Sequence, residues 1–252
     1  MAKTKKKGKD DEVVINLDSM GVPIAILISG VLIAAVIFFV SRGDTPVTID
    51  NAQDTTGQVG QEEVAAQDTG FASLEGAAVL GNPETATVAV VEYSDYMCGF
   101  CRRHAEETFP SIQQNYIDTG KILYVFKEFP LSSPGQLGYS IAEGGVCVLN
   151  LSDSETFFDY HKGAFDLGSE DDIIAFAQDL GIDGDEMSAC LADGRYRDDI
   201  DAKAQEGRDA GVTGTPGFIV GRINDGGAVE GGLIAGALPY QNFADAIDAL
   251  LD

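Results

Sequence analysis

Two short stretches of the chain are apolar in the manner of buried strands. Val88–Tyr93 (VAVVEY) and Lys121–Phe126 (KILYVF) are rich in β-branched and aromatic residues. Between them, four residues recur at the 4-3-4 spacing of one helix face: Ala105, Phe109, Ile112 and Tyr116. The pattern predicts a strand, a helix and a second central strand. Because proline removes an amide donor, we expect the helix to bend or restart at Pro110.

The second half of the chain changes its period twice. From about residue 134 to 210 the apolar spacing is helical, and one of the helices is expected to end at Gly181. Gly217–Gly221 then predicts a strand, Gly231–Ala237 a glycine-rich edge strand, and Phe243–Leu251 a closing amphipathic helix. This order of elements predicts an α/β fold with a mixed sheet.

The N-terminal region has a separate pattern. Five lysines lie between Lys3 and Lys9, and Met20–Val40 is 21 residues long without a charged side chain. As a helix this run would be about 30 Å long, enough to cross a bilayer. The lysines favour a basic cytoplasmic tail (residues 1–19) before an uncleaved transmembrane anchor (residues 20–41). A cleaved signal peptide is the main alternative, but the run is long for one and has no clear cleavage site.

A polar stretch follows the predicted anchor. Residues 42–76 are dominated by Asp, Gln, Thr and Gly, show no period, and predict a flexible linker. The alternative is an ordered arm packed on the domain, to which Phe71 and Leu74 would belong. The globular domain is expected to span residues 77–252.

Candidate chemistry lies where the first strand meets the helix. Cys98 and Cys101 form a Cys-x-x-Cys pair, with Cys98 at or near the helix N-terminus. Unpaired amides and the helix dipole stabilise a thiolate there. Such a cysteine can attack or be attacked, and the second cysteine then resolves the mixed disulfide.

A cysteine pair can also bind zinc or form a structural disulfide. Zinc needs four ligands, whereas Cys147 and Cys190 stand alone and neither His104 nor His161 forms a ligand pair with a nearby cysteine. We therefore predict no metal. An inert structural disulfide is the second alternative, and redox chemistry is favoured over both.

Two motifs in this order resemble the DsbA-like branch of the thioredoxin superfamily. They are Glu92–Cys101 (EYSDYMCGFC) and Gly211–Val220 (GVTGTPGFIV). The resemblance runs from about Ala78 to the C-terminus and implies a thioredoxin fold whose helical insertion is the predicted helical block. It also implies that Pro216 follows a cis peptide bond beside the cysteine pair, and that Thr215 offers its backbone to a substrate. For Thr215–Pro216 taken alone, an ordinary trans turn is the alternative.

The resemblance implies roles for three further residues. Some members of the family carry a second cysteine pair in matching places, which implies a structural Cys147–Cys190 disulfide. Two free cysteines or a redox relay are the alternatives. Glu92 occupies the position of a buried acid that exchanges a proton with Cys101, whereas its alternative is a solvated strand residue. No role is assigned to His104, and His161 is expected at the edge of the core.

The net charge of the chain argues against nucleic acid as a partner. The chain has 41 acidic against 16 basic side chains, a net charge of −25. Such a chain is not expected to bind nucleic acid. The resemblance implies an extracytoplasmic thiol–disulfide oxidoreductase that acts on exported proteins with cysteine thiols, uses no cofactor beyond the cysteine pair, and exchanges electrons with a membrane partner.

Three hypotheses about the function stay open. An oxidase that introduces disulfides is favoured, and a reductase or isomerase is the alternative within the enzyme class. A non-catalytic binding or holdase module is the third. The dipeptide between the cysteines, Gly99-Phe100, lacks the histidine of the best-known oxidants of the family, which leaves the direction of electron flow open.

Overall fold

A computed structural model describes residues 69–133 and 135–252 of the chain. The predicted cytoplasmic tail and transmembrane anchor, and most of the predicted linker, lie outside these residues. Among the described helices, none is long and apolar enough to cross a membrane.

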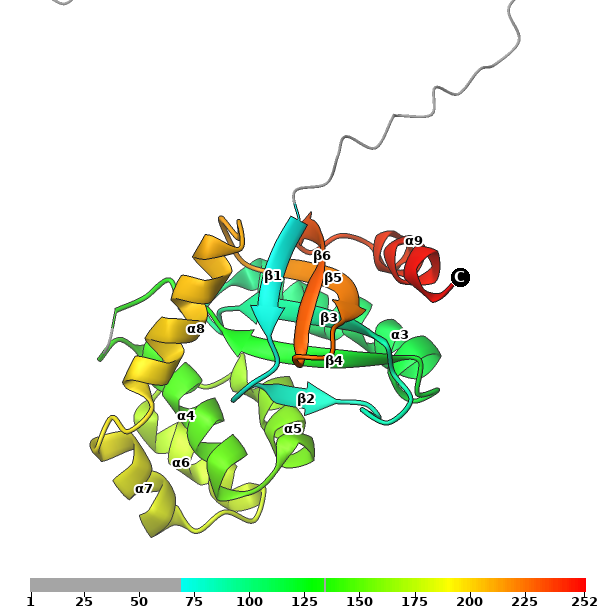
Figure 1. The fold of residues 1–252 in the computed structure, drawn as a ribbon. Helices are drawn as coiled ribbons and strands as arrows, with labels where there is room; N and C mark the ends of the chain where they lie inside the picture. The colour runs from blue at the N-terminus through cyan, green and yellow to red at the C-terminus, as the bar shows by residue number, and fades with distance from the viewer. Residues whose placement is uncertain (1–68, 134) are drawn as a thin grey trace, which may run out of the picture. The chain divides into compact units, whose positions relative to one another are not determined.

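A six-stranded mixed sheet forms the centre of the domain (Figure 1), in the order β1-β6-β5-β3-β4-β2. Its strands are β1 (Thr69–Ser73), β2 (Ala78–Leu80), β3 (Val88–Ser94), β4 (Ile122–Glu128), β5 (Gly217–Ile223) and β6 (Ala228–Ala235). The central strands β3 and β4 are parallel, and every other neighbouring pair is antiparallel. Both predicted central strands are buried on both faces, as expected from their nearly continuous apolar runs.

Two predictions at the edge of the sheet were wrong. β6 is not an edge strand, because β1 pairs with it from Thr69↔Gly232 to Ser73↔Ala228. The predicted linker therefore extends too far, since its last residues form β1. The ordered-arm alternative is correct for these residues. In β1 the buried side chains are small and Phe71 faces outward, so no apolar alternation marks the strand.

The first helical segment passes from β3 to β4. It consists of α2 (Gly99–Arg103), the π-helical segment η2 (His104–Thr108), α3 (Phe109–Ile112) and the π-helical segment η3 (Gln113–Ile117). The predicted restart occurs at α3, which has Pro110 in its first turn. Wide π turns on both sides of α3 let the segment change its path without ending.

The predicted helical insertion is confirmed. It contains α4 (Leu137–Leu151), α5 (Ser154–Ala164), α6 (Glu170–Asp179), α7 (Gly184–Ala192) and α8 (Arg197–Asp209). As expected, Gly181 follows α6 and has a positive φ of 89°. The last helix is α9 (Tyr240–Leu251). In Figure 1, α4, α6 and α7 lie together at one end of the sheet, and α5 lies nearer to α3, where Phe158 stacks on Phe109 with ring centroids 6.1 Å apart.

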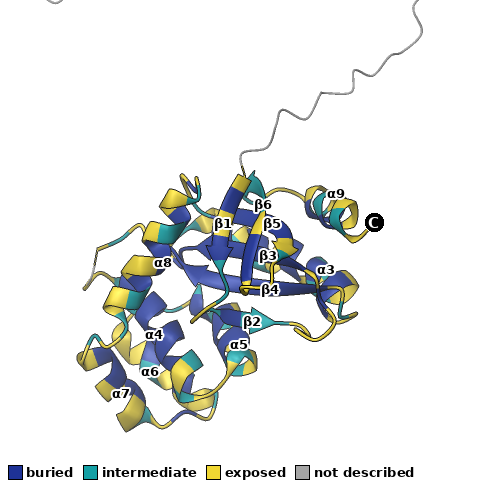
Figure 2. Cartoon of the chain, viewed as in Figure 1, coloured by how far each residue is buried: buried dark blue, intermediate teal, exposed yellow. Residues whose placement is uncertain are grey.

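The two faces of the sheet are covered by different elements. On one face, Val90 and Phe218 belong to a large apolar cluster with Phe109, Phe243 and most of the insertion. On the other face, Val91 packs in a smaller cluster under α8. Figure 2 shows the strands mostly in the colour of buried residues, with helices exposed on their outer sides. Because Glu92 is two residues after Val90, it points into the larger cluster.

Candidate active site

The two nearby cysteines lie at the predicted junction of strand and helix. Cys98 has an extended backbone and caps α2, and the Arg102 amide donates to its carbonyl oxygen at 3.1 Å. Both cysteines are free thiols, and Cys98 is half-buried whereas Cys101 is fully buried. Only the first cysteine is therefore open to a second protein.

A distant loop completes the surroundings of Cys98. The peptide bond between Thr215 and Pro216 is cis, and the Thr215 carbonyl oxygen accepts a hydrogen bond from Cys98 Sγ at 3.3 Å. The loop comes directly before β5, which pairs with β3 up to Tyr93↔Gly217. The pairing of β3 with β5 thus brings together residues that are 117 positions apart.

The two thiols differ in acidity. Burial alone would raise the pKa of Cys98, but hydrogen bonding to its sulfur from the Thr215 side chain and from Cys101 outweighs it and lowers the pKa of this thiol. Burial raises the pKa of Cys101, and the nearby Glu92 carboxyl adds to that effect. Cys98 is therefore the more acidic thiol of the pair, and Cys101 is the one that holds its proton more tightly.

Glu92 is a buried acid, not a solvated strand residue. Glu92 is 1% exposed, and burial raises the pKa of its carboxyl from 4.5 to about 7, although the hydrogen bond from Tyr124 and the nearby Ser94 hydroxyl act in the opposite direction. The Tyr124 hydroxyl donates to Oε2 at 2.6 Å. Oε1 has no hydrogen-bond partner within the described residues.

Two residues of this region were missed by sequence reasoning. His104 Nε2 lies 2.9 Å from the Tyr124 hydroxyl oxygen, and both side chains are fully buried. The available signals were weak. His104 is three residues after Cys101 on the same helical segment, and Tyr124 occupies an ordinary apolar position of β4.

Exposed apolar residues lie on the two segments whose amides are hydrogen-bonded to Asp95, three residues before the half-buried cysteine. The exposed fraction is 59% for Met97, 60% for Phe100 and 66% for Leu131. Asp95 holds two of them in place, since its carboxylate accepts from the amides of Met97 and Leu131 at 2.7 Å. Large exposed apolar side chains beside a reactive thiol favour contact with an unfolded chain.

Several hollows in the surface differ in how near they lie to the active thiols. A groove of about 340 Å³ beside Thr215 is lined by residues 211–217 and 233–236. Larger hollows of about 480 and 510 Å³ lie near Gly120 and near Phe71, and neither contains a cysteine. The smaller groove is the relevant one, because it adjoins the loop that contacts Cys98.

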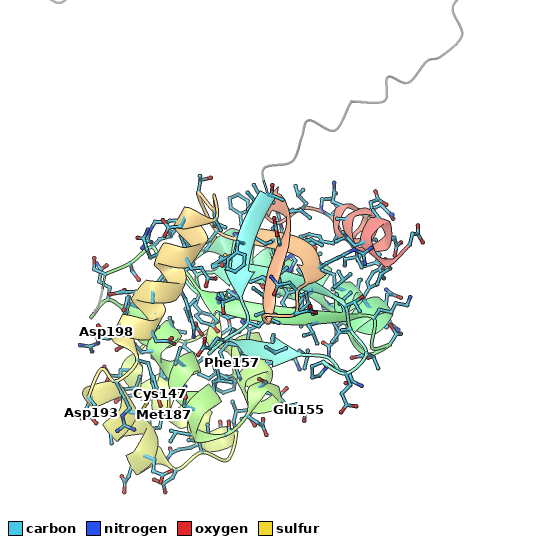
Figure 3. All side chains as sticks on the ribbon, in the orientation of Figure 1. Cys147, Glu155, Phe157, Met187, Asp193 and Asp198 are labelled. Atoms are coloured by element: carbon cyan, nitrogen blue, oxygen red, sulfur yellow. A yellow bond between two sulfur atoms is a disulfide. The ribbon has the colours of Figure 1, made fainter. Side chains whose placement is uncertain are left out.

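The second cysteine pair forms a disulfide. Cys147 of α4 and Cys190 of α7 are bonded, with Cα atoms 6.1 Å apart. Both are nearly fully buried in the insertion, where Figure 3 labels Cys147 and Met187. Within the described part of the chain, no three His, Cys, Asp or Glu side chains are arranged so that they could bind a metal ion. The prediction that the chain uses no cofactor stays a prediction.

Comparisons with known proteins agree with this geometry. A family model described as thioredoxin matches residues 73–249. The chain belongs to the thioredoxin superfamily. Within it, the chain is 32% identical over 98 residues to "Disulfide bond formation protein D" of Bacillus subtilis, a match covering 39% of this chain and 42% of that protein. The DsbA-like branch that the motifs implied is thereby supported.

Further relatives extend the match. A "Putative protein-disulfide oxidoreductase" of Rickettsia felis is 27% identical, covering 59% of this chain and 54% of that protein. The crystal structure of Wolbachia pipientis alpha-DsbA1 superposes with a TM-score of 0.60 at 26% identity, covering 69% of this chain and 90% of that one. The chain thus spans about half the length of these two curated relatives and most of the solved thioredoxin-superfamily domain.

Proposed function

We propose that the chain is an extracytoplasmic thiol–disulfide oxidoreductase that introduces disulfides into exported proteins through Cys98 and Cys101. The observation that carries the proposal is the asymmetry of the pair. Cys98 is accessible and its pKa is lowered, whereas Cys101 is buried and its pKa is raised. A stabilised Cys98 thiolate favours the reduced form of the pair, which is the property of an oxidant. The relatives named as a disulfide bond formation protein and a protein-disulfide oxidoreductase support the same chemistry.

Oxidation of a substrate would proceed in two exchanges. A substrate thiolate attacks Cys98 Sγ, the bond to Cys101 breaks, and Cys101 leaves as a thiolate that takes a proton from Glu92. A second substrate thiolate then attacks the substrate sulfur of the mixed disulfide and releases the Cys98 thiolate. The substrate loses two electrons and the cysteine pair gains them.

Substrate binding is assigned to the groove and the apolar side chains around Cys98. An extended segment would lie along the 340 Å³ groove, with its backbone against Thr215 and Pro216. Met97 and Phe100 would contact its apolar side chains. Backbone contacts with apolar contacts suit many unfolded exported proteins, because neither demands a particular sequence.

Residues 1–41 extend this proposal to the location. The basic tail and the uncharged run are proposed to anchor the chain in the cell membrane, with its N-terminus in the cytoplasm and the thioredoxin domain outside. A membrane redox partner would reoxidise the cysteine pair.

The test measures the reduction potential of the Cys98–Cys101 pair against glutathione, together with oxidation of a dithiol peptide. A potential near about −120 mV supports an oxidase, whereas one near about −270 mV supports the reductase alternative. The variant Cys98→Ser should abolish peptide oxidation. The control Cys147→Ala/Cys190→Ala removes the other pair and should retain it. Full peptide oxidation by Cys98→Ser would overturn the role of Cys98, whereas a wild type that oxidises no peptide would overturn the enzymatic proposal and favour a binding module.

A further inference from the structure

Three polar side chains form a chain of contacts inside an otherwise apolar core. The Tyr124 hydroxyl donates to Glu92 Oε2 at 2.6 Å, and its oxygen lies 2.9 Å from His104 Nε2. The His104 ring packs against Phe218 and Phe243, with ring centroids 4.6 and 5.1 Å apart. Buried polar groups of this kind are costly unless they are paired, so their arrangement calls for an explanation.

The direction of each hydrogen bond follows from the number of available protons. Tyrosine has a single hydroxyl proton, which is committed to Glu92. While Tyr124 donates to Glu92, His104 donates from Nε2 to the Tyr124 oxygen. Burial lowers the pKa of His104 to about 3, so the ring is neutral and its other nitrogen, Nδ1, carries no proton. Nδ1 has no hydrogen-bond partner within the described residues.

We propose that Tyr124 and His104 are positioning residues that hold Glu92 Oε2 and leave Oε1 as the oxygen that exchanges a proton with Cys101. This inference rests on the proposed function, and it adds two residues to it. His104 orients the Tyr124 hydroxyl, and Tyr124 occupies one carboxyl oxygen. The second oxygen, which makes no hydrogen bond within the described residues, is then free to carry the proton.

The proton transfer completes the first exchange described above. When the substrate sulfur bonds to Cys98 Sγ, the electron pair of the broken disulfide bond passes to Cys101 Sγ. That thiolate takes the proton from Glu92 Oε1, and Glu92 becomes a carboxylate. The hydroxyl of Tyr124 stabilises this carboxylate, and neutral His104 supplies no proton. Reoxidation of the pair runs the same transfer in reverse.

The groups around this array leave Glu92 as the one that titrates near neutral pH in the oxidised protein. They come from β3, the loop after it, the first helical segment, β4 and α5, and are Ser94, Tyr96, Cys101, His104, Tyr124 and His161. Burial raises the pKa values of the tyrosines and lowers those of the histidines to about 3. In the oxidised protein, the disulfide removes both thiol titrations.

The first test titrates the Glu92 carboxyl in the oxidised full chain. With ¹³C-labelled glutamate, the Glu92 signal is the one absent from Glu92→Gln, and its midpoint is expected well above the ordinary 4.5, because burial is the largest cause of the raised pKa. Tyr124→Phe removes a hydrogen bond to a charged group and should raise the midpoint by about one pH unit. Tyr116→Phe is the control, because it removes a tyrosine hydroxyl that donates to Asp248 at 2.9 Å. It should leave the Glu92 midpoint unchanged.

The second test asks whether His104 acts through Tyr124. His104→Phe should raise the Glu92 midpoint by less than Tyr124→Phe does, and should add nothing in a chain that already carries Tyr124→Phe. His104→Gln keeps an N–H donor in a similar place and should restore the wild-type midpoint. Equal effects of His104→Phe with and without the tyrosine hydroxyl would overturn the role of His104.

The third test connects the array to the reaction. The rate at which a peptide thiol opens the Cys98–Cys101 disulfide is measured against pH, and Tyr124→Phe should move the profile upward by the same amount as the Glu92 midpoint. An active wild type whose profile is unchanged by Tyr124→Phe would overturn this inference alone. A wild type that opens no substrate disulfide bond would overturn the proposed function as well, before any variant is compared.

Discussion

The chain carries two cysteine pairs that have the same atoms in different surroundings. Cys98 and Cys101 are separated by two residues and are free thiols, one of them accessible. Cys147 and Cys190 are separated by 43 positions and form a disulfide between two helices. Both members of the second pair are buried among apolar side chains of the insertion.

The surroundings account for the difference between the two pairs. Cys98 receives hydrogen bonds that lower its pKa and lies beside a groove, whereas Cys147 and Cys190 have neither. A thiol is reactive when its thiolate is stabilised and accessible. Two cysteines that have neither property form an inert disulfide crosslink. The comparison teaches that sequence spacing marks candidate cysteines, while access and hydrogen bonding decide their use.

Removing the buried disulfide should have the largest effect on stability. The crosslink closes a loop of 43 residues, for which chain entropy corresponds to about 4 kcal/mol of stabilisation. Cys147→Ala/Cys190→Ala should therefore lower the free energy of unfolding by about that amount, measured by denaturant titration. The double variant Cys98→Ala/Cys101→Ala is the matched control and should change it far less. Loss of peptide oxidation at temperatures where the first variant is folded would instead indicate a relay between the pairs.

Replacing Glu92 should change how stability depends on pH. Glu92 binds its proton more tightly in the folded protein, with a pKa of about 7 against 4.5. Its contribution is therefore fully present below about pH 4.5 and is lost as the pH rises through 7. Relative to Glu92→Gln, the wild type should lose about 3 kcal/mol of unfolding free energy across this window.

The measurement compares denaturant titrations from pH 4.5 to 8.5, with Cys98 and Cys101 reduced and Cys147–Cys190 intact, as checked by mass after alkylation. Glu107→Gln, at an exposed position of the same helical segment as Cys101, is the control and should follow the wild type. Parallel pH curves for the wild type and Glu92→Gln would contradict a raised pKa for this carboxyl.

The smallest expected effect comes from the dipeptide between the active cysteines. Phe100 is 60% exposed, and the Arg103 guanidinium stacks on its ring at 5.0 Å. Phe100→His adds a group that can stabilise the Cys98 thiolate and should raise the reduction potential by about 30 mV, a tenfold change in the equilibrium. Phe100→Ala separates loss of the phenyl ring from gain of the imidazole. A potential equally raised in both variants would show that the ring, not the missing histidine, controls the pair.

Local pattern was enough to predict most of the domain. β3 and β4 are buried on both faces, so their apolar runs stand out, and the helical insertion shows its period over five helices. β1 was not recognised as a strand because its inward residues are Gly70 and Ala72. A Cβ atom at Gly70 would lie 2.9 Å from Ile219 Cδ1 and 3.0 Å from the Ala210 carbonyl oxygen, so a side chain there would require its neighbours to shift.

By itself, the sequence determined the cysteine spacing, the strand-to-helix junction at Cys98 and the family to which the chain belongs. These depend on residues close together in the chain or on motifs in a recognisable order. Only the tertiary structure decided that Glu92, His104 and Tyr124 form one array, because the parallel pairing of β3 with β4 and the packing of the helical segment bring them together. A residue's neighbours in sequence carry no record of such contacts, since burial and hydrogen bonding arise only when distant segments pack.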